Sequence, residues 1–260
     1  MCILRSVRSN KSTLSGAARR WLLFIGAQLA IVPCAEAQCV DPSTLVKTTV
    51  SISRNFDAEE RKVTPGIVGI GGTGWFLTPE VMVTAAHVSE AMRLSTTQWK
   101  DIEVWDGKSK TVVATRIQSV AGSLTEKMVL VNLRTPFSGA VSLPVRQEPL
   151  FPEERVVTLA YPKGHLRFAR GRFVAYGEDR QFSGAAMMEI YEGADRLVLD
   201  HGASGAPVLD CQGRVVAVVS SILTQTLNFG LHSVKVSTAW QTPNVISMPA
   251  DALTGSSRSE

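Results

Sequence analysis

The sequence is poor in cysteine, histidine and tyrosine, with four, four and three of these residues among 260. Its cysteines and histidines show no Cys-x-x-Cys or His-x-x-x-His spacing, so the usual residue pattern of a zinc site is missing. No apolar run reaches the roughly 20 residues that a membrane-spanning helix needs. We therefore expect a protein with no metal, no organic cofactor and no stable membrane anchor.

The positive charge of the chain is concentrated near its start. The formal net charge is +4, but the segment before residue 38 has five basic residues and one acid. The basic residues are Arg5, Arg8, Lys11, Arg19 and Arg20. The remainder carries 22 basic and 22 acidic residues and no Lys/Arg cluster with interleaved aromatics, which argues against a nucleic-acid-binding protein.

The same N-terminal segment has the pattern of a secretory signal peptide. An apolar run over 21–32 follows the basic region, and Ala35-Glu36-Ala37 provides a small-x-small cleavage site. The alternative of a membrane anchor is disfavoured because Pro33 and Glu36 end the apolar run early. The Arg19-Arg20 pair fits a twin-arginine signal poorly, so we predict general secretion, cleavage after Ala37, and a secreted or periplasmic protein.

Two cysteines, Cys39 and Cys211, remain after such cleavage. In an oxidising compartment they could form a disulfide that ties the start of the mature chain to its C-terminal half. The alternative is two unpaired thiols, and the sequence alone leaves both open.

The rest of the chain favours an all-β protein, with 45% hydrophobic residues in short β-branched runs separated by turn residues. Brief helices are expected after His87 and near 249–253, and a flexible tail over 251–260. We expect strands at 68–70, 74–77, 81–84, 102–105, 111–117, 128–133, 155–160, 168–175, 185–191, 196–199, 206–209, 215–220 and 231–236.

Two motifs carry candidate chemistry. Thr84-Ala85-Ala86-His87 follows an apolar strand, and Gly202-Ala203-Ser204-Gly205 forms a loop of small residues that leads into another strand. A serine hydroxyl is a weak nucleophile unless a base accepts its proton, and neutral imidazole has a suitable pKa. The combination therefore predicts nucleophilic catalysis by Ser204, with His87 as general base and the Gly202 and Ser204 N–H groups as oxyanion donors.

At these motifs the sequence resembles the chymotrypsin/trypsin-like serine proteases, across roughly residues 65–250. The resemblance implies two six-stranded antiparallel Greek-key β-barrels with the active site in the cleft between them. We expect an N-terminal arm over 38–44 and barrels over 45–150 and 151–250. By the same resemblance, the pocket for the residue before the scissile bond is lined by Val198, Leu199, Ser220, Ser221 and Ile222, which predicts a small or medium apolar residue there.

The third member of the family's catalytic triad is the point where the sequence departs from the pattern. The aspartate position falls on Lys127, and loss of that acid costs about 10⁴-fold in rate in this family. Three possibilities follow: Glu126 reaches His87 through a one-residue shift, Asp101 or Asp106 serves instead, or the site is a weak dyad or inactive. The sequence thus predicts a monomeric exported serine endopeptidase acting on protein or peptide substrates, with a catalytically weakened binding protein of the same fold as the alternative.

Overall fold

A computed structural model describes residues 39–118, 128–177, 184–195, 198–222, 224–229, 232–237 and 242–255. Within these ranges the side chains of residues 42, 221–237 and 254–255 are outside the description. The predicted signal peptide and the pair Glu126 and Lys127 lie outside the described residues.

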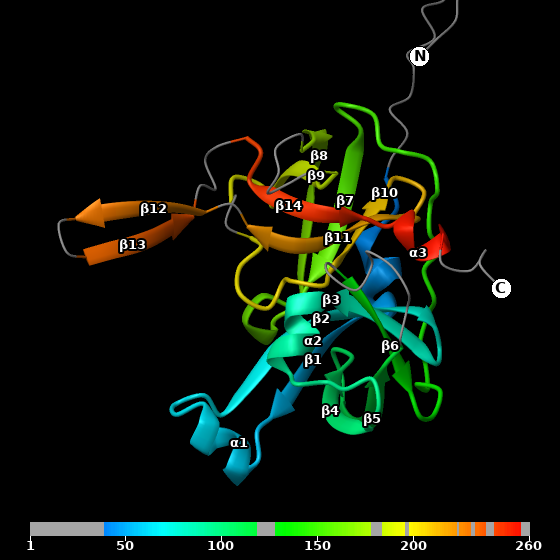
Figure 1. Cartoon of the computed structure of the whole chain (residues 1–260). Coiled ribbons are helices and arrows are strands. Elements are labelled where there is room, and N and C mark those ends of the chain that lie inside the picture. Colours follow the sequence, from blue (N-terminus) through cyan, green and yellow to red (C-terminus); the bar gives the residue numbers. More distant parts are fainter. Residues whose placement is uncertain are drawn as a thin grey trace, which may run out of the picture. The chain divides into compact units, whose positions relative to one another are not determined.

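The described strands form two closed six-stranded antiparallel barrels, which confirms the predicted all-β double-barrel fold (Figure 1). The first barrel has the order β1-β2-β3-β6-β5-β4 and the second has the order β10-β11-β14-β9-β8-β7. The strands of the first are β1 (Thr49–Asn55), β2 (Gly69–Thr78), β3 (Val81–Ala85), β4 (Lys100–Trp105), β5 (Lys110–Ile117) and β6 (Met128–Leu133). Those of the second are β7 (Arg155–Ala160), β8 (Arg167–Tyr176), β9 (Ala186–Tyr191), β10 (Pro207–Asp210), β11 (Val215–Ile222) and β14 (Val245–Pro249).

The remaining described elements are short. They are the 3-10 helices η1 (Pro42–Thr48) and η3 (Pro162–Gly164), the helices α1 (Ala58–Val63), α2 (Ala86–Ala91) and α3 (Ala252–Gly255), and a hairpin of β12 (Thr224–Phe229) and β13 (His232–Ser237). The hairpin is a separate two-stranded sheet that extends away from the second barrel (Figure 1). In the described part of the chain, no helix has the length and apolar character needed to span a bilayer.

Most predicted strands are present, and the differences have physical causes. The strand predicted at 196–199 is wrong at Val198 and Leu199, which are irregular in backbone but buried. Their apolar character therefore reflects burial in the core and not strand pairing. The brief helices predicted after His87 and near residue 253 are present as α2 and α3, and α3 occupies the first part of the segment predicted as a flexible tail.

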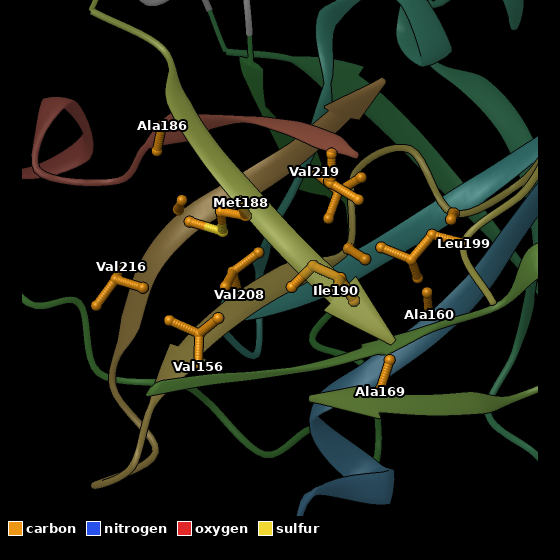
Figure 2. Packing of buried hydrophobic residues seen from close by; sticks show 14 of the residues in the cluster. Val156, Ala160, Ala169, Ala186, Met188, Ile190, Leu199, Val208, Val216 and Val219 are labelled. Carbon is orange, nitrogen blue, oxygen red and sulfur yellow. The ribbon is translucent and has the colours of Figure 1, made fainter. Parts of the chain in front are cut away.

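Three clusters of buried apolar side chains stabilise the molecule. One fills the second barrel, where Met188, Ile190 and Val208 pack together (Figure 2), and another fills the first barrel. The third joins the two, since it combines Trp75 of β2 with Leu159 of β7 and other residues of both barrels. Each large side chain buried in this way contributes about 1.5–3 kcal/mol, so the third cluster fixes one barrel against the other.

Cys39 and Cys211 form a disulfide, which is the first of the two alternatives that the sequence leaves open. The Val40 amide also donates a hydrogen bond to the Cys211 carbonyl, at 3.0 Å. The disulfide closes a sequence separation of 172 residues and fastens the segment before η1 to the turn between β10 and β11. This attachment holds the start of the described chain on the second barrel.

Candidate active site

His87 lies in the first turn of α2, immediately after β3 of the first barrel. Ala85 and Ala86 are buried at this junction, where the strand turns into the helix. The imidazole of His87 itself is exposed to the cleft described below. The two alanines thus pack in the core, and the histidine that follows them points its imidazole into the cleft, where it is accessible to a substrate.

Ser204 lies in a loop of tight turns between residue 200 and β10. The Ala203 amide donates to the Asp200 carbonyl at 2.9 Å, and the Gly205 amide donates to the Val219 carbonyl at 2.8 Å. Ala203 and Gly205 are buried on either side of the half-buried serine. These turns present the Ser204 hydroxyl at the surface of the second barrel.

Glycine is required at two positions of this loop. Gly202 has φ +96°, and a Cβ there would lie 2.8 Å from the Tyr161 carbonyl oxygen. Gly205 has φ +92°, and a Cβ there would lie 2.1 Å from the Thr73 carbonyl oxygen. Both positions combine a left-handed backbone conformation with contacts closer than real Cβ atoms make, so only glycine allows the loop to pack in this form.

Two amides of the loop are left free to bind a ligand. Among the described residues, no acceptor is paired with the N–H groups of Gly202 and Ser204, whereas the intervening Ala203 amide is used. Unpaired donors next to a nucleophile can stabilise negative charge that develops on a substrate oxygen. These are the two amides that the sequence predicts as oxyanion donors.

The candidate nucleophile, base and donors open onto one cleft. A cleft of about 790 Å³ is lined by His87, Ser204 and Gly202. Its other walls include the glycine-rich start of β2 and the segment around η3. The cleft therefore brings together groups from both barrels that are more than one hundred residues apart in the sequence.

The family comparison matches this geometry. The trypsin-like peptidase domain matches residues 72–218, which extend from β2 to β11 and include both His87 and Ser204. The chain belongs to this family. A comparison with curated protein sequences gives no significant match.

Several solved structures share the fold of this trypsin-like peptidase at low sequence identity. The active form of the Rv3671c protease from Mycobacterium tuberculosis is 16% identical, with a TM-score of 0.53 over 83% of this chain and 81% of that one. Deg5 is 14% identical, with a TM-score of 0.53 over 82% of this chain and 88% of Deg5. The serine endoprotease from Yersinia pestis is 12% identical, with a TM-score of 0.52 over 81% of this chain and 61% of that one.

The electrostatic surroundings of His87 favour the neutral imidazole. Partial desolvation lowers the pKa of His87 below its ordinary value of 6.5, and the carboxylate of Glu90 on the same helix raises it by a smaller amount. His87 makes no side-chain hydrogen bond to a described residue, and the Ser204 hydroxyl donates to the Ser220 carbonyl at 3.1 Å. In the resting site the base is thus available, and the nucleophile is held by its own barrel.

None of the described carboxylates is hydrogen-bonded to His87. Asp106 accepts from the amides of Lys108 and Ser109, both at 2.8 Å, in the turn between β4 and β5. These bonds lower the pKa of Asp106. Asp101 is exposed on β4. No group of three or more metal-ligating side chains occurs in the part of the chain that the structure describes.

The predicted substrate-binding residues divide into three groups. Ser220 lies next to the nucleophile, because its carbonyl accepts the Ser204 hydroxyl. Val198 and Leu199 belong to the core of the second barrel, where Leu199 is seen in Figure 2. Ser221 and Ile222 continue β11, but their side chains lie outside the described ones.

Sequence reasoning did not single out Thr73, which contacts the Ser204 loop from β2. It lies in the run Gly72-Thr73-Gly74, and a hydroxyl between two glycines on a strand of the core was the available signal. The hydrogen-bond partners of its hydroxyl lie 88 and 129 residues away in the sequence, so these contacts depend on the tertiary fold.

Proposed function

We propose that this trypsin-like peptidase is an exported serine endopeptidase that cleaves peptide bonds through an acyl-enzyme on Ser204. The observation that carries the proposal is the convergence of His87, the Ser204 hydroxyl and the free amides of Gly202 and Ser204 on one cleft. Each group has the chemical property that its step needs, and no metal is required for any of the steps.

In the proposed mechanism, His87 accepts the proton of the Ser204 hydroxyl while Oγ bonds to the substrate carbonyl carbon. The carbonyl oxygen becomes an oxyanion, which the Gly202 and Ser204 amides stabilise. His87 then gives its proton to the amine nitrogen, the C–N bond breaks, and the first product leaves. Water then enters: His87 takes a proton from it while its oxygen bonds to the acyl carbon. The bond between that carbon and Ser204 Oγ breaks, Oγ recovers the proton from His87, and the second product leaves as an acid.

The lowered pKa of His87 supports the role of base, because most of the imidazole is then neutral at pH 7.

For the triad acid we keep the candidates predicted from the sequence, of which Glu126 is the first. We further propose a small or medium apolar residue before the scissile bond, on the basis of Val198, Leu199, Ser220, Ser221 and Ile222. The Cys39–Cys211 disulfide supports function in an oxidising compartment, reached through the predicted signal peptide.

A second candidate function is that of a binding protein with a weakened catalytic site. Lys127 favours it, since a lysine at the acid position would neither hold the imidazole tautomer nor stabilise the imidazolium ion. The resting bond from Ser204 to the Ser220 carbonyl, in place of a bond to His87, is in line with this candidate.

Digestion of a mixed peptide library, analysed by mass spectrometry, tests the proposal. We expect cleavage mainly after small and medium apolar residues, and no cleavage by the Ser204→Ala variant. Cleavage mainly after Arg, Lys or Glu would overturn the proposed specificity but not the peptidase activity. An intact library after incubation with folded, processed protein would favour the binding protein.

A further inference from the structure

Thr73 connects the first barrel to the nucleophile loop of the second. It is fully buried in β2, and its backbone amide donates to the Ser204 carbonyl at 3.0 Å. Its hydroxyl donates to the Gly202 carbonyl at 2.6 Å and accepts from the Tyr161 amide at 3.0 Å. One residue therefore binds the carbonyls of both residues whose amides are the proposed oxyanion donors.

We propose that Thr73 is a positioning residue that sets the orientation of the oxyanion donors by fixing the peptide unit between them and the peptide unit after Ser204. This inference rests on the proposed function for its catalytic consequence, but the geometric effect on the loop is independent of catalysis. Thr73 does not touch the reacting atoms, and it acts through Gly202 and Ser204.

Each of the four peptide units between His201 and Gly205 has its carbonyl held by a hydrogen bond. The His201 carbonyl accepts from the Lys163 amide at 2.7 Å, and the Ala203 carbonyl accepts from the Ala206 amide at 3.0 Å. These two units contain the free Gly202 and Ser204 N–H groups. Because a trans peptide is planar, each bond to the carbonyl also fixes the direction of the N–H group on the opposite side.

The other two units alternate with these, and Thr73 holds both of them. Its hydroxyl binds the carbonyl of the Gly202–Ala203 unit, and its amide binds that of the Ser204–Gly205 unit. Gly202 has the backbone freedom of glycine, so without a partner for its carbonyl the neighbouring peptide unit can rotate. Rotation of that unit would misalign the oxyanion donors on either side of it.

The hydroxyl has a second effect through Tyr161. The Tyr161 amide that it accepts precedes η3, and the Lys163 amide of η3 is the donor to the His201 carbonyl. The Thr73 hydroxyl is thus used both as donor and as acceptor. As donor it holds the Gly202 carbonyl, and as acceptor it holds the segment that binds the His201 carbonyl. Serine preserves both capacities, whereas valine preserves the shape and removes both.

The test compares Thr73→Val, Thr73→Ser and a control, Thr115→Val, in the processed chain. Thr115 is also fully buried in the first barrel, and its hydroxyl also donates to a backbone carbonyl, that of Lys100 at 2.9 Å. The control thus removes a hydrogen bond of the same kind without contact with the Ser204 loop.

The first readout is hydrogen exchange by mass spectrometry on the protein without substrate. We expect Thr73→Val to accelerate exchange of the Ala203, Gly205 and Ala206 amides, with no change in β11. Thr73→Ser and Thr115→Val should exchange in this loop like the wild type. The second readout is steady-state kinetics, where Thr73→Val should lower kcat by about tenfold to 10²-fold with little change in KM.

Unchanged exchange at residues 203–206 in folded Thr73→Val would overturn the inference, as would an equal loss of kcat in Thr115→Val. If Thr73→Val does not fold, Thr73→Ser decides: normal loop exchange and kcat support the inference, and a tenfold lower kcat contradicts it. A wild-type protein without hydrolysis would refute the proposed function, and the exchange data would still decide the role of Thr73.

Discussion

The two halves of the candidate site differ in how firmly they are held. Ser204 sits in a loop in which every carbonyl from residue 200 to residue 204 accepts a hydrogen bond, and glycine is required at positions 202 and 205. His87, on the other barrel, is exposed and makes no side-chain hydrogen bond within the described residues. The candidate nucleophile and the proposed oxyanion donors are therefore preorganised, whereas the candidate base is fixed chiefly by its backbone.

This difference separates two contributions to catalysis. Preorganised donors stabilise the transition state without reorganisation, and their contribution is present before substrate binds. An orienting acid, by contrast, selects the imidazole tautomer and stabilises the imidazolium ion, which the described carboxylates do not do by direct hydrogen bonding. Variants on each side should therefore have distinct signatures.

Among the variants below, Gly202→Ala should have the largest effect on kcat, because it distorts the hydrogen-bonded Ser204 loop. The added Cβ would lie 2.8 Å from the Tyr161 carbonyl oxygen and 3.2 Å from the Lys163 amide nitrogen, at a φ that alanine rarely adopts. We expect kcat to fall about 10² to 10³-fold, the usual effect of losing an oxyanion donor. Kinetics on a peptide substrate measure this, and a variant with normal kcat would show that this amide is not a donor.

A smaller effect, on stability alone, is expected from removing the disulfide. The double substitution of Cys39 and Cys211 by serine should reduce the free energy of unfolding by about 2–5 kcal/mol, because the unfolded chain loses a long-range constraint. Denaturant titration of the processed protein provides the measurement. Since neither residue lines the cleft, kcat should be unchanged, and a large loss of kcat would contradict this separation.

The pH dependence of kcat/KM tests the proposed role of His87 as base. In the proposed mechanism activity requires neutral His87, so kcat/KM should fall as the pH decreases through a pKa below 6.5. Glu90 raises that pKa, and Glu90→Gln should therefore move the acidic limb to still lower pH. A limb that moves to higher pH, or one that stays in place, would show that Glu90 does not act on the base.

The smallest effect is expected from the exposed ion pair beside the nucleophile loop, in which Lys163 Nζ lies 2.7 Å from Asp200 Oδ2. Lys163→Met should raise the pKa of Asp200 toward its ordinary 3.8 and change the unfolding free energy by less than about 1 kcal/mol. The Lys163 backbone amide still holds the His201 carbonyl, so kcat should be unchanged. NMR titration of Asp200 and thermal unfolding measure the two quantities, and a tenfold loss of kcat would indicate a role for the charge.

The sequence predicts the all-β class well because each strand carries its own apolar pattern and turn residues, whereas the two barrels follow from the resemblance at the His87 and Ser204 motifs. It misplaces a strand at Val198 and Leu199, since a short apolar run has the same composition whether it pairs or only packs. β1 is absent from the predicted strands, although it lies within the predicted first barrel, because Ser51 and Ser53 interrupt its apolar character.

The candidate site was predictable only in its local motifs. His87 and Ser204 stand out by the small residues around them, whereas the role of Thr73 depends on partners in another barrel. No local pattern identifies such a contact, because both partners are backbone groups that any residue could supply.

Labelling with a fluorophosphonate tests the central claim, that His87 activates Ser204 in a preorganised site, most directly. The account predicts that the folded wild-type protein is labelled at Ser204, as located by mass spectrometry, and that His87→Ala slows labelling by about 10² to 10⁴-fold. An unlabelled wild-type protein, or equal labelling of wild type and His87→Ala, would contradict it.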